Sequence, residues 1–255
     1  MPNKVLTIFD TQIRPDNLEL NRPLLKAIGQ LIVDERPTHI VHIGDNYDMK
    51  SLSQYDFAKN NRLVFDGREV DADVQAGNKA LSLLVGPLER LQQRQRDNKK
   101  KVYQPKLHFT MGNHEQRVDR FNELKGLVDL KYDIEQFGFE VHPFLKPVKI
   151  GGVSFVHYAY NPLSGRPLGG TAEYRLNKLK MSFVQGHEQT FKYAQEYLND
   201  GRKISALVCG SCYLHEEDYK GFQGNNHFRG VAMLHNVKDG VYDLEQVSVE
   251  RLLGK

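Results

Sequence analysis

The chain has 255 residues, of which 40% are hydrophobic and 26% charged, and its formal net charge is +3. This length and composition are those of a globular protein with a substantial core, and they exclude a disordered or fibrous chain. The small net charge gives no argument for nucleic-acid binding. No linker divides the sequence, so we expect a single domain over residues 1–255.

The beginning of the chain carries no recognisable targeting signal. Residues 1–10 lack the basic start, apolar stretch and small-residue cleavage site of a signal peptide. No apolar run approaches the length of a membrane-spanning helix. We therefore expect a cytoplasmic protein with no membrane partner.

The N-terminal part of the chain predicts a β-α-β unit. An apolar, β-branched run over 5–10 ends at Asp10 and predicts the first strand. Apolar residues at helical spacing predict a helix over 23–36. A second apolar run over 38–43 then leads through a glycine to Asp45. A right-handed crossover between two parallel strands is expected for such a unit.

A long polar connection and a second helix follow. Residues 48–73 are polar, weakly periodic and longer than a routine connection, so we expect a functional loop or lid there. An apolar stripe at helical spacing predicts a helix over 71–96. The run over 106–111 predicts a third strand, which breaks at a glycine and delivers Asn-His-Glu, residues 113–115, at its C-terminal end.

The second half of the chain is rich in strands, which together with the first half indicates an α/β fold. Gly-Gly and Asp-Gly turns predict two hairpins, over 147–156 and 230–249. The remaining expected elements are strands over 181–185 and 204–209, a short helix over 118–130, and a helix through Tyr193 and Leu198.

Polar residues with metal-binding side chains follow several of the predicted strands. Open parallel sheets place their ligand sites beyond the carboxyl ends of the strands, so we expect these side chains to converge. Their carboxylate, amide and imidazole groups suit two hard or borderline divalent ions. The candidate ligands are Asp10, Gln12, Asp45, Asn113, His157, His187 and Gln189.

Two residue positions in this region suggest specific roles. Two dications about 4 Å apart repel by roughly 16 kcal/mol at an effective dielectric of about 20, so a bridging carboxylate is needed between them. Asp45, at the middle strand end, is the natural bridge. A metal pair would activate water and hold phosphoryl oxygens, and a nearby imidazole would protonate the leaving oxygen. His114 is the candidate for this catalytic imidazole.

The order of these motifs resembles that of the calcineurin-like metallophosphoesterases, over residues 5 to about 237. The family pattern is Asp-x-His, Gly-Asp-x-x-Asp, Gly-Asn-His-Asp or Glu, a lone His, and Gly-His-x-His. The matching segments are Asp10-Thr-Gln12, Gly44-Asp-Asn-Tyr-Asp48, Gly112-Asn-His-Glu115, His157 and Gly186-His-Glu-Gln189. The resemblance implies a four-layered α/β/β/α sandwich with mixed sheets, which fits the alternating first half and the strand-rich second half.

The resemblance also implies how the ligands divide between two metal ions. One ion would be held by Asp10, Gln12, Asp45 and Gln189. The other would be held by Asp45, Asn113, His157 and His187. Both departures from the family pattern, Gln12 and Gln189 in place of histidine, fall on the first ion. An amide oxygen is a harder donor than imidazole nitrogen, so Mn²⁺ is the expected metal, with Mg²⁺, Zn²⁺ and iron as alternatives.

Two later segments extend the resemblance to metallophosphoesterases encoded by tailed phages, which would act in the host cytoplasm. These segments are Gly210-Ser-Cys-Tyr213 and Asn226-His-Phe-Arg-Gly230. The expected function is a dimetal phosphodiesterase acting on nucleic acid such as DNA, or on a nucleotide. The alternatives are a phosphomonoesterase on a nucleotide or phosphoprotein, and a non-catalytic metal-binding scaffold with a degraded first site. The sequence does not determine the oligomeric state, and a homodimer is one of the alternatives.

Several further residues have a functional and an ordinary interpretation. Asp10 and Asp45 could be helix caps instead of ligands. Cys209 and Cys212 form one Cys-x-x-Cys, which lacks the second pair of a structural zinc site and is either redox-active or simply buried. A last group could contact substrate or lie solvated on the surface, namely Tyr160, Asn161, Arg166, Arg175, His215, Glu216, Glu217 and His227.

Overall fold

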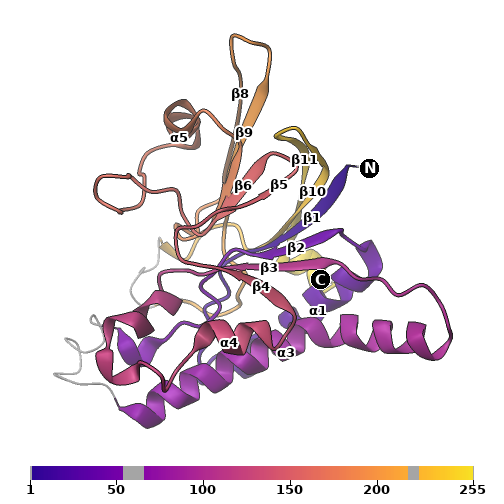
Figure 1. Cartoon of the computed structure of the whole chain (residues 1–255), viewed down its shortest axis with the longest axis vertical. Helices are drawn as coiled ribbons and strands as arrows, with labels where there is room; N and C mark the ends of the chain where they lie inside the picture. The colour runs from indigo at the N-terminus through magenta and orange to yellow at the C-terminus, as the bar shows by residue number, and fades with distance from the viewer. Residues whose placement is uncertain (1, 54–65, 218–223, 255) are drawn as a thin grey trace.

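A computed structural model of the chain describes residues 2–53, 66–217 and 224–254 and shows a mixed α/β fold with two β-sheets (Figure 1). The larger sheet has six strands in the order β11-β10-β1-β2-β3-β4. Strands β1 to β4 are parallel to one another, β10 runs antiparallel to β1, and β11 runs antiparallel to β10 at the edge of the sheet. Its strands are β1 (Asn3–Ile8), β2 (His39–His42), β3 (Lys106–Thr110), β4 (Phe139–His142), β10 (Gly230–Lys238) and β11 (Val241–Ser248).

The smaller sheet has five strands in the order β5-β6-β7-β9-β8. Its three central strands are parallel, and each edge strand runs antiparallel to its neighbour. The strands are β5 (Val148–Ile150), β6 (Val153–Val156), β7 (Phe183–Gln185), β8 (Lys192–Tyr197) and β9 (Lys203–Val208). Both sheets are therefore mixed, and each offers several parallel strand ends.

Helices lie against both sheets (Figure 1). The long helices α1 (Leu18–Glu35) and α3 (Gly67–Asp97) pack on each other below the larger sheet. Helix α3 begins where the Asp66 carboxylate accepts a hydrogen bond from the Arg68 N–H, at 2.8 Å. The shorter helices are α4 (Leu130–Glu135), α5 (Ala172–Leu179) and α7 (Val249–Leu252), with 3₁₀ turns η1 (Lys50–Leu52), η2 (Glu115–Arg120) and η3 (Asn122–Leu124).

Alternation along the strands of the smaller sheet separates two apolar cores. In β7, Val184 belongs to the main core, which also contains strands of the larger sheet, whereas its neighbour Phe183 belongs to a second core. In β9, Leu207 and Ala206 divide in the same way. Helix α5 supplies Leu176 to the second core. The two sheets thus share one core, and α5 covers the other face of the smaller sheet.

The structure confirms most of the predicted strands and both hairpins. The two-residue turns Gly151-Gly152 and Asp239-Gly240 have positive φ throughout, as the Gly-Gly and Asp-Gly sequences predict. The helix expected from residue 23 begins earlier, at Leu18. The helix expected from residue 71 begins at Gly67. Most of the loop or lid expected over 48–73 lies outside the described residues.

Two secondary-structure predictions were wrong, and some elements were not predicted. The helix expected through Tyr193 and Leu198 is strand β8, because residues 192–197 pair with the neighbouring strand β9 along their whole length. The helix expected over 118–130 is replaced by η2, η3 and a turn, and α4 begins only at Leu130. Strand β4 and helix α5 were not predicted.

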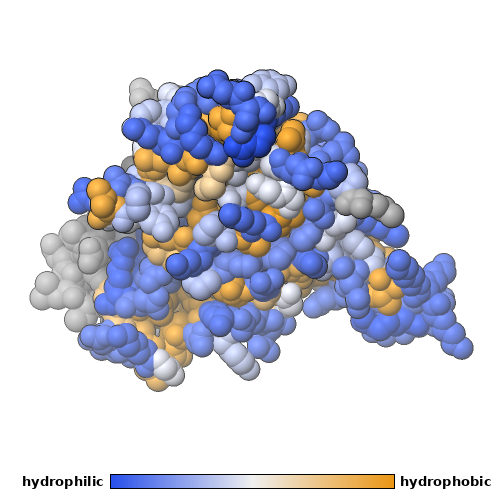
Figure 2. Space-filling view, turned by 45° about the horizontal axis from the view of Figure 1, so that its top comes forward, coloured by the Kyte–Doolittle hydropathy of each residue, from blue (hydrophilic) through white to orange (hydrophobic). Residues whose placement is uncertain are grey.

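No described helix combines the length and apolar character that crossing a membrane would require. The face shown in Figure 2 is mainly hydrophilic, with apolar side chains scattered between polar ones. The large apolar side chains that are exposed come from several separate elements, including Leu20, Leu127 and Tyr197.

Candidate metal centre

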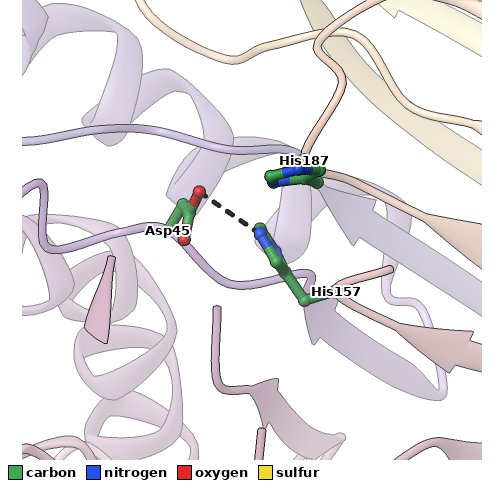
Figure 3. Close-up of side chains that lie close together, drawn as sticks. All are labelled: Asp45, His157 and His187. Atoms are coloured by element: carbon green, nitrogen blue, oxygen red, sulfur yellow. Dashed lines mark ion pairs between the residues drawn. The ribbon is translucent and has the colours of Figure 1, made fainter. Parts of the chain in front are cut away.

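The carboxyl ends of parallel strands from both sheets meet at one place. Asp10, Asp45 and Asn113 follow β1, β2 and β3 of the larger sheet. His157 and His187 follow β6 and β7 of the smaller sheet, and Figure 3 shows both imidazoles beside the Asp45 carboxylate. The sheets bring together residues that are far apart in the sequence, as the sequence pattern predicted.

Four side chains offer ligand atoms at spacings that suit one metal ion. Asn113 Oδ1 lies 2.9 Å from His157 Nε2 and 2.7 Å from His187 Nδ1. Asp45 Oδ2 lies 3.3 Å from His157 Nε2. His157 Nδ1–H donates to the Ile43 carbonyl at 2.9 Å, so Nε2 is the ring nitrogen that faces the other ligand atoms. Asp45, Asn113, His157 and His187 could therefore hold a dication.

The remaining predicted ligands lie beside this set and include two oxygens without a hydrogen-bond partner. Asp10 Oδ1 and Gln12 Oε1 are buried and accept no hydrogen bond from the described residues. Asp10 Oδ2 accepts from the His187 N–H at 3.0 Å. The Tyr213 hydroxyl donates to Gln189 Oε1 at 2.8 Å. The buried oxygens of Asp10 and Gln12 fit a cation, which would supply their missing partner.

The backbone is unusual at the same residues. Gln12, Asp45, His187 and Gln189 all have positive φ, between 43° and 70°. Non-glycine residues in this region store conformational strain, which is concentrated at functional sites in proteins. The chain thus turns sharply at four predicted ligands and holds their side chains in place.

Glycine is required where the backbone passes close to two ligand carboxylates. A Cβ on Gly112 would lie 2.1 Å from Asp45 Oδ1. A Cβ on Gly186 would lie 2.3 Å from Asp10 Oδ1. Both distances are far below van der Waals contact, so any larger residue would displace the carboxylate. The glycines that precede Asn113 and His187 in the sequence therefore have a steric role.

Burial and mutual charge shift the pKa values of the carboxylates and imidazoles in the centre. Burial raises the pKa of Asp10 to about 7, although His157 opposes this rise. Burial would also raise the pKa of Asp45, but His114 and His157 hold it well below its usual range. Burial lowers the pKa of His157, yet Asp45 and Asp10 outweigh burial and raise it to about 9. A proton on His157 thus balances the carboxylates, and a dication could take its place.

His114 lies beside the proposed ligands and is held by Asp48. Its Nδ1–H donates to Asp48 Oδ1 at 2.8 Å and to the Asp48 carbonyl at 2.9 Å. Its Nε2 lies 3.7 Å from Asp45 Oδ2 and 3.2 Å from Arg117 Nη2. Burial lowers the pKa of His114, but Asp45 and Asp48 outweigh burial and the net pKa is raised. His114 is therefore buried beside the four side chains of the candidate ion site, with Asp48 bound to its Nδ1.

The sequence analysis missed the charged group that holds Asp48. Arg14 Nη1 lies 3.0 Å from Asp48 Oδ2 and 3.1 Å from Glu217 Oε1. His215 Nε2 in turn lies 2.7 Å from Glu217 Oε1. His215 and Glu217 are both buried, so the surface-loop interpretation was wrong for them, whereas Glu216 is exposed. His227 is half-buried, and its Nε2 lies 2.6 Å from Ser211 Oγ.

The structure also shows where the remaining residues lie for which the sequence left both a functional and an ordinary interpretation open. Arg175 is buried and pairs with Glu188, so it is not a solvated arginine, whereas Tyr160, Asn161 and Arg166 are exposed. Asp10 and Asp45 cap no described helix. Cys209 and Cys212 are buried free thiols, and burial raises the pKa of both. This favours the interpretation as buried reduced thiols.

Comparisons with known proteins place the chain in no family. No family model and no curated protein matches it. One of the similar solved structures is a crystal structure that aligns with 97% of this chain and 100% of that chain, at 13% sequence identity and a TM-score of 0.36. A likeness at this level carries no argument. The fold and the site define a mixed α/β protein with clusters of histidine and carboxylate side chains that could hold metal ions.

Proposed function

We propose that the chain is a dimetal phosphoesterase with the four-layered calcineurin-like metallophosphoesterase fold, and that it hydrolyses phosphodiester bonds in DNA or a nucleotide. One observation carries the proposal. The buried oxygens of Asp10 and Gln12 lack a hydrogen-bond partner among the described residues, beside a complete set of four ligand side chains. Two adjacent cation sites, one complete and one built from harder donors, account for both features.

Seven residues would hold the two ions, as the family resemblance implies. The complete set of Asp45, Asn113, His157 and His187 would hold one ion, and Asp10, Gln12, Asp45 and Gln189 the other. Bound there, the ions would supply an activated water nucleophile and electrostatic stabilisation of the phosphoryl oxygens. Asp10, Gln12, Asp45 and Gln189, which form the first site, offer only oxygen donors. Mn²⁺ or Mg²⁺ therefore suits this site better than zinc.

His114 would act on the leaving group. The Nδ1–H is committed to Asp48, so Nε2 is the nitrogen that can hold a proton for the leaving oxygen. Arg14 and Glu217 fix Asp48, and Arg117 contacts the imidazole from the other side. The chain itself therefore provides proton transfer and orientation.

A specific contact also favours the non-catalytic scaffold as a second candidate. The Tyr213 hydroxyl already donates to the Gln189 side-chain oxygen, as it would in a first site that holds no ion. The two candidates predict different metal contents. A phosphoesterase takes up two ions per chain at saturating Mn²⁺, whereas the scaffold takes up one ion and has no turnover.

The test combines metal counting with two model substrates. We expect Mn²⁺-dependent hydrolysis of bis-p-nitrophenyl phosphate, and slower hydrolysis of the monoester p-nitrophenyl phosphate. Asp45→Asn should abolish hydrolysis and lower the ion count, because the repulsion between two dications is then less compensated. Two bound ions and near-normal turnover in that variant would contradict the bridging role. A preference for the monoester would favour the phosphomonoesterase.

A further inference from the structure

A second group of potential ligands lies on β3 and β4, away from the strand ends. His108 of β3 is in register with Glu140 of β4, and His142 lies two residues further along β4. Residues two apart on a strand point to the same face, so these three side chains lie side by side. None of them is among the seven residues assigned to the proposed dimetal centre. They therefore form a separate cluster.

The three side chains are spaced as ligands around one ion. His108 Nδ1 lies 3.2 Å from His142 Nε2 and 3.4 Å from Glu140 Oε2. His142 Nε2 lies 4.0 Å from Glu140 Oε1. In a tetrahedral zinc site with bonds of about 2.05 Å, neighbouring ligand atoms are about 3.4 Å apart. A small rotation of the exposed Glu140 side chain would bring the longest of these distances into that range.

A fourth side chain, that of His39, contacts the ring nitrogen of His108 that does not face the other two side chains. His39 Nδ1 lies 3.0 Å from His108 Nε2, and the two rings are stacked with centroids 5.3 Å apart. When His108 donates its Nε2–H to His39, its Nδ1 lone pair faces His142 and Glu140. Histidine ligands in metal sites almost always donate their other N–H to such a partner. His39 is thus placed as an outer support and not as a ligand.

We propose that His108, Glu140 and His142 bind a single transition-metal dication of the zinc class. Two imidazole nitrogens and one carboxylate suit Zn²⁺, Co²⁺, Ni²⁺ or Cu²⁺ and disfavour Mg²⁺ and Ca²⁺. Glu140 is 68% exposed, so the remaining coordination position opens to solvent. Its location on β3 and β4, away from the strand ends, distinguishes this site from the dimetal centre.

The test counts zinc in a full-length background that lacks the central site. In the double variant Asp45→Asn/His187→Ala, equilibrium dialysis and mass spectrometry should find one zinc per chain. Adding His142→Ala or Glu140→Gln to this background should weaken zinc binding at least about 10-fold, because each removes a ligand. Glu140 is exposed, so Glu140→Gln tests the site without disturbing the core. Adding His39→Ala should weaken binding about 10–100-fold, as expected for an outer partner.

A matched control removes another histidine–carboxylate pair. His235 Nε2 lies 2.8 Å from Glu245 Oε2 on β10 and β11, and neither belongs to the proposed site. His235→Ala in the same background should leave zinc affinity unchanged. The proposal is overturned if the background binds no zinc, or if Glu140→Gln and His142→Ala both bind zinc as tightly as the background does. Co²⁺ bound at the site should also show visible absorption that His142→Ala changes.

Discussion

Glu115 allows a direct test of how the metal centre is held together. Its buried carboxylate accepts four backbone hydrogen bonds, from Asn46 and Tyr47 to Oε1 at 2.8 and 3.0 Å, and from Asp45 and Gly112 to Oε2 at 2.9 and 2.8 Å. In Glu115→Gln an NH₂ group replaces one oxygen, so two N–H groups lose their acceptor. At ~1.5–3 kcal/mol per hydrogen bond to a charged group, the free energy of unfolding should fall by about 3–6 kcal/mol.

Urea denaturation of the metal-free protein measures this loss. The control is Glu89→Gln on the exposed side of α3, which should change the free energy of unfolding by no more than about 0.5 kcal/mol. Because the expected loss approaches the whole stability of some domains, ~5–15 kcal/mol, Glu115→Asp provides a milder variant that keeps the charge. If Glu115→Gln lowers the free energy of unfolding by less than about 1 kcal/mol, this carboxylate does not stabilise the contact between the segments that follow β2 and β3.

Three further predictions concern the residues of the proposed metal sites and their neighbours. His114→Ala should lower turnover about 10²–10⁴-fold with unchanged metal content, and loss of metal would instead make His114 a ligand. Gln12→His with Gln189→His should tighten the first site and shift it towards zinc, measured by metal content and diester hydrolysis across a metal series. Arg14→Met should lower the free energy of unfolding, measured by urea denaturation, by about 3–5 kcal/mol, because Asp48 and Glu217 lose their buried cation. The control Arg90→Met, at an exposed residue, should change it little.

The strand ends of the candidate site could be predicted from the sequence because the signal is local. Each apolar run stops at a glycine or directly before a polar residue, as at Asp45 and His157. The run therefore shows both the strand and the place where its end presents a side chain. This local pattern is sufficient for the seven proposed ligands, all of which the structure brings to one region.

Residues whose role depends on distant partners could not be found in this way. Arg14 and Glu217 are 203 residues apart in sequence, and nothing near either one indicates that they form a buried ion pair. Strand β8 was missed for a related reason. Its apolar residues Tyr193 and Ala194 are adjacent and show no clear alternation, so pairing with β9 decides its conformation. Edge strands and buried ion pairs are determined by partners far away in the sequence, so a local sequence pattern does not reveal them.

The backbone of the metal centre bears on the choice between an enzyme and a scaffold. Gln12 and Gln189 have φ of 43° and 53°, in the same left-handed region as Asp45 and His187. Such a conformation costs a non-glycine residue of the order of 1 kcal/mol or more, and a loop with no ligand role could avoid this cost with glycine. We interpret this conformation as retained for the glutamine side chains, as the proposed first site requires. This supports a first site with amide oxygen ligands, and a wild-type chain that takes up only one ion at saturating Mn²⁺ would contradict it.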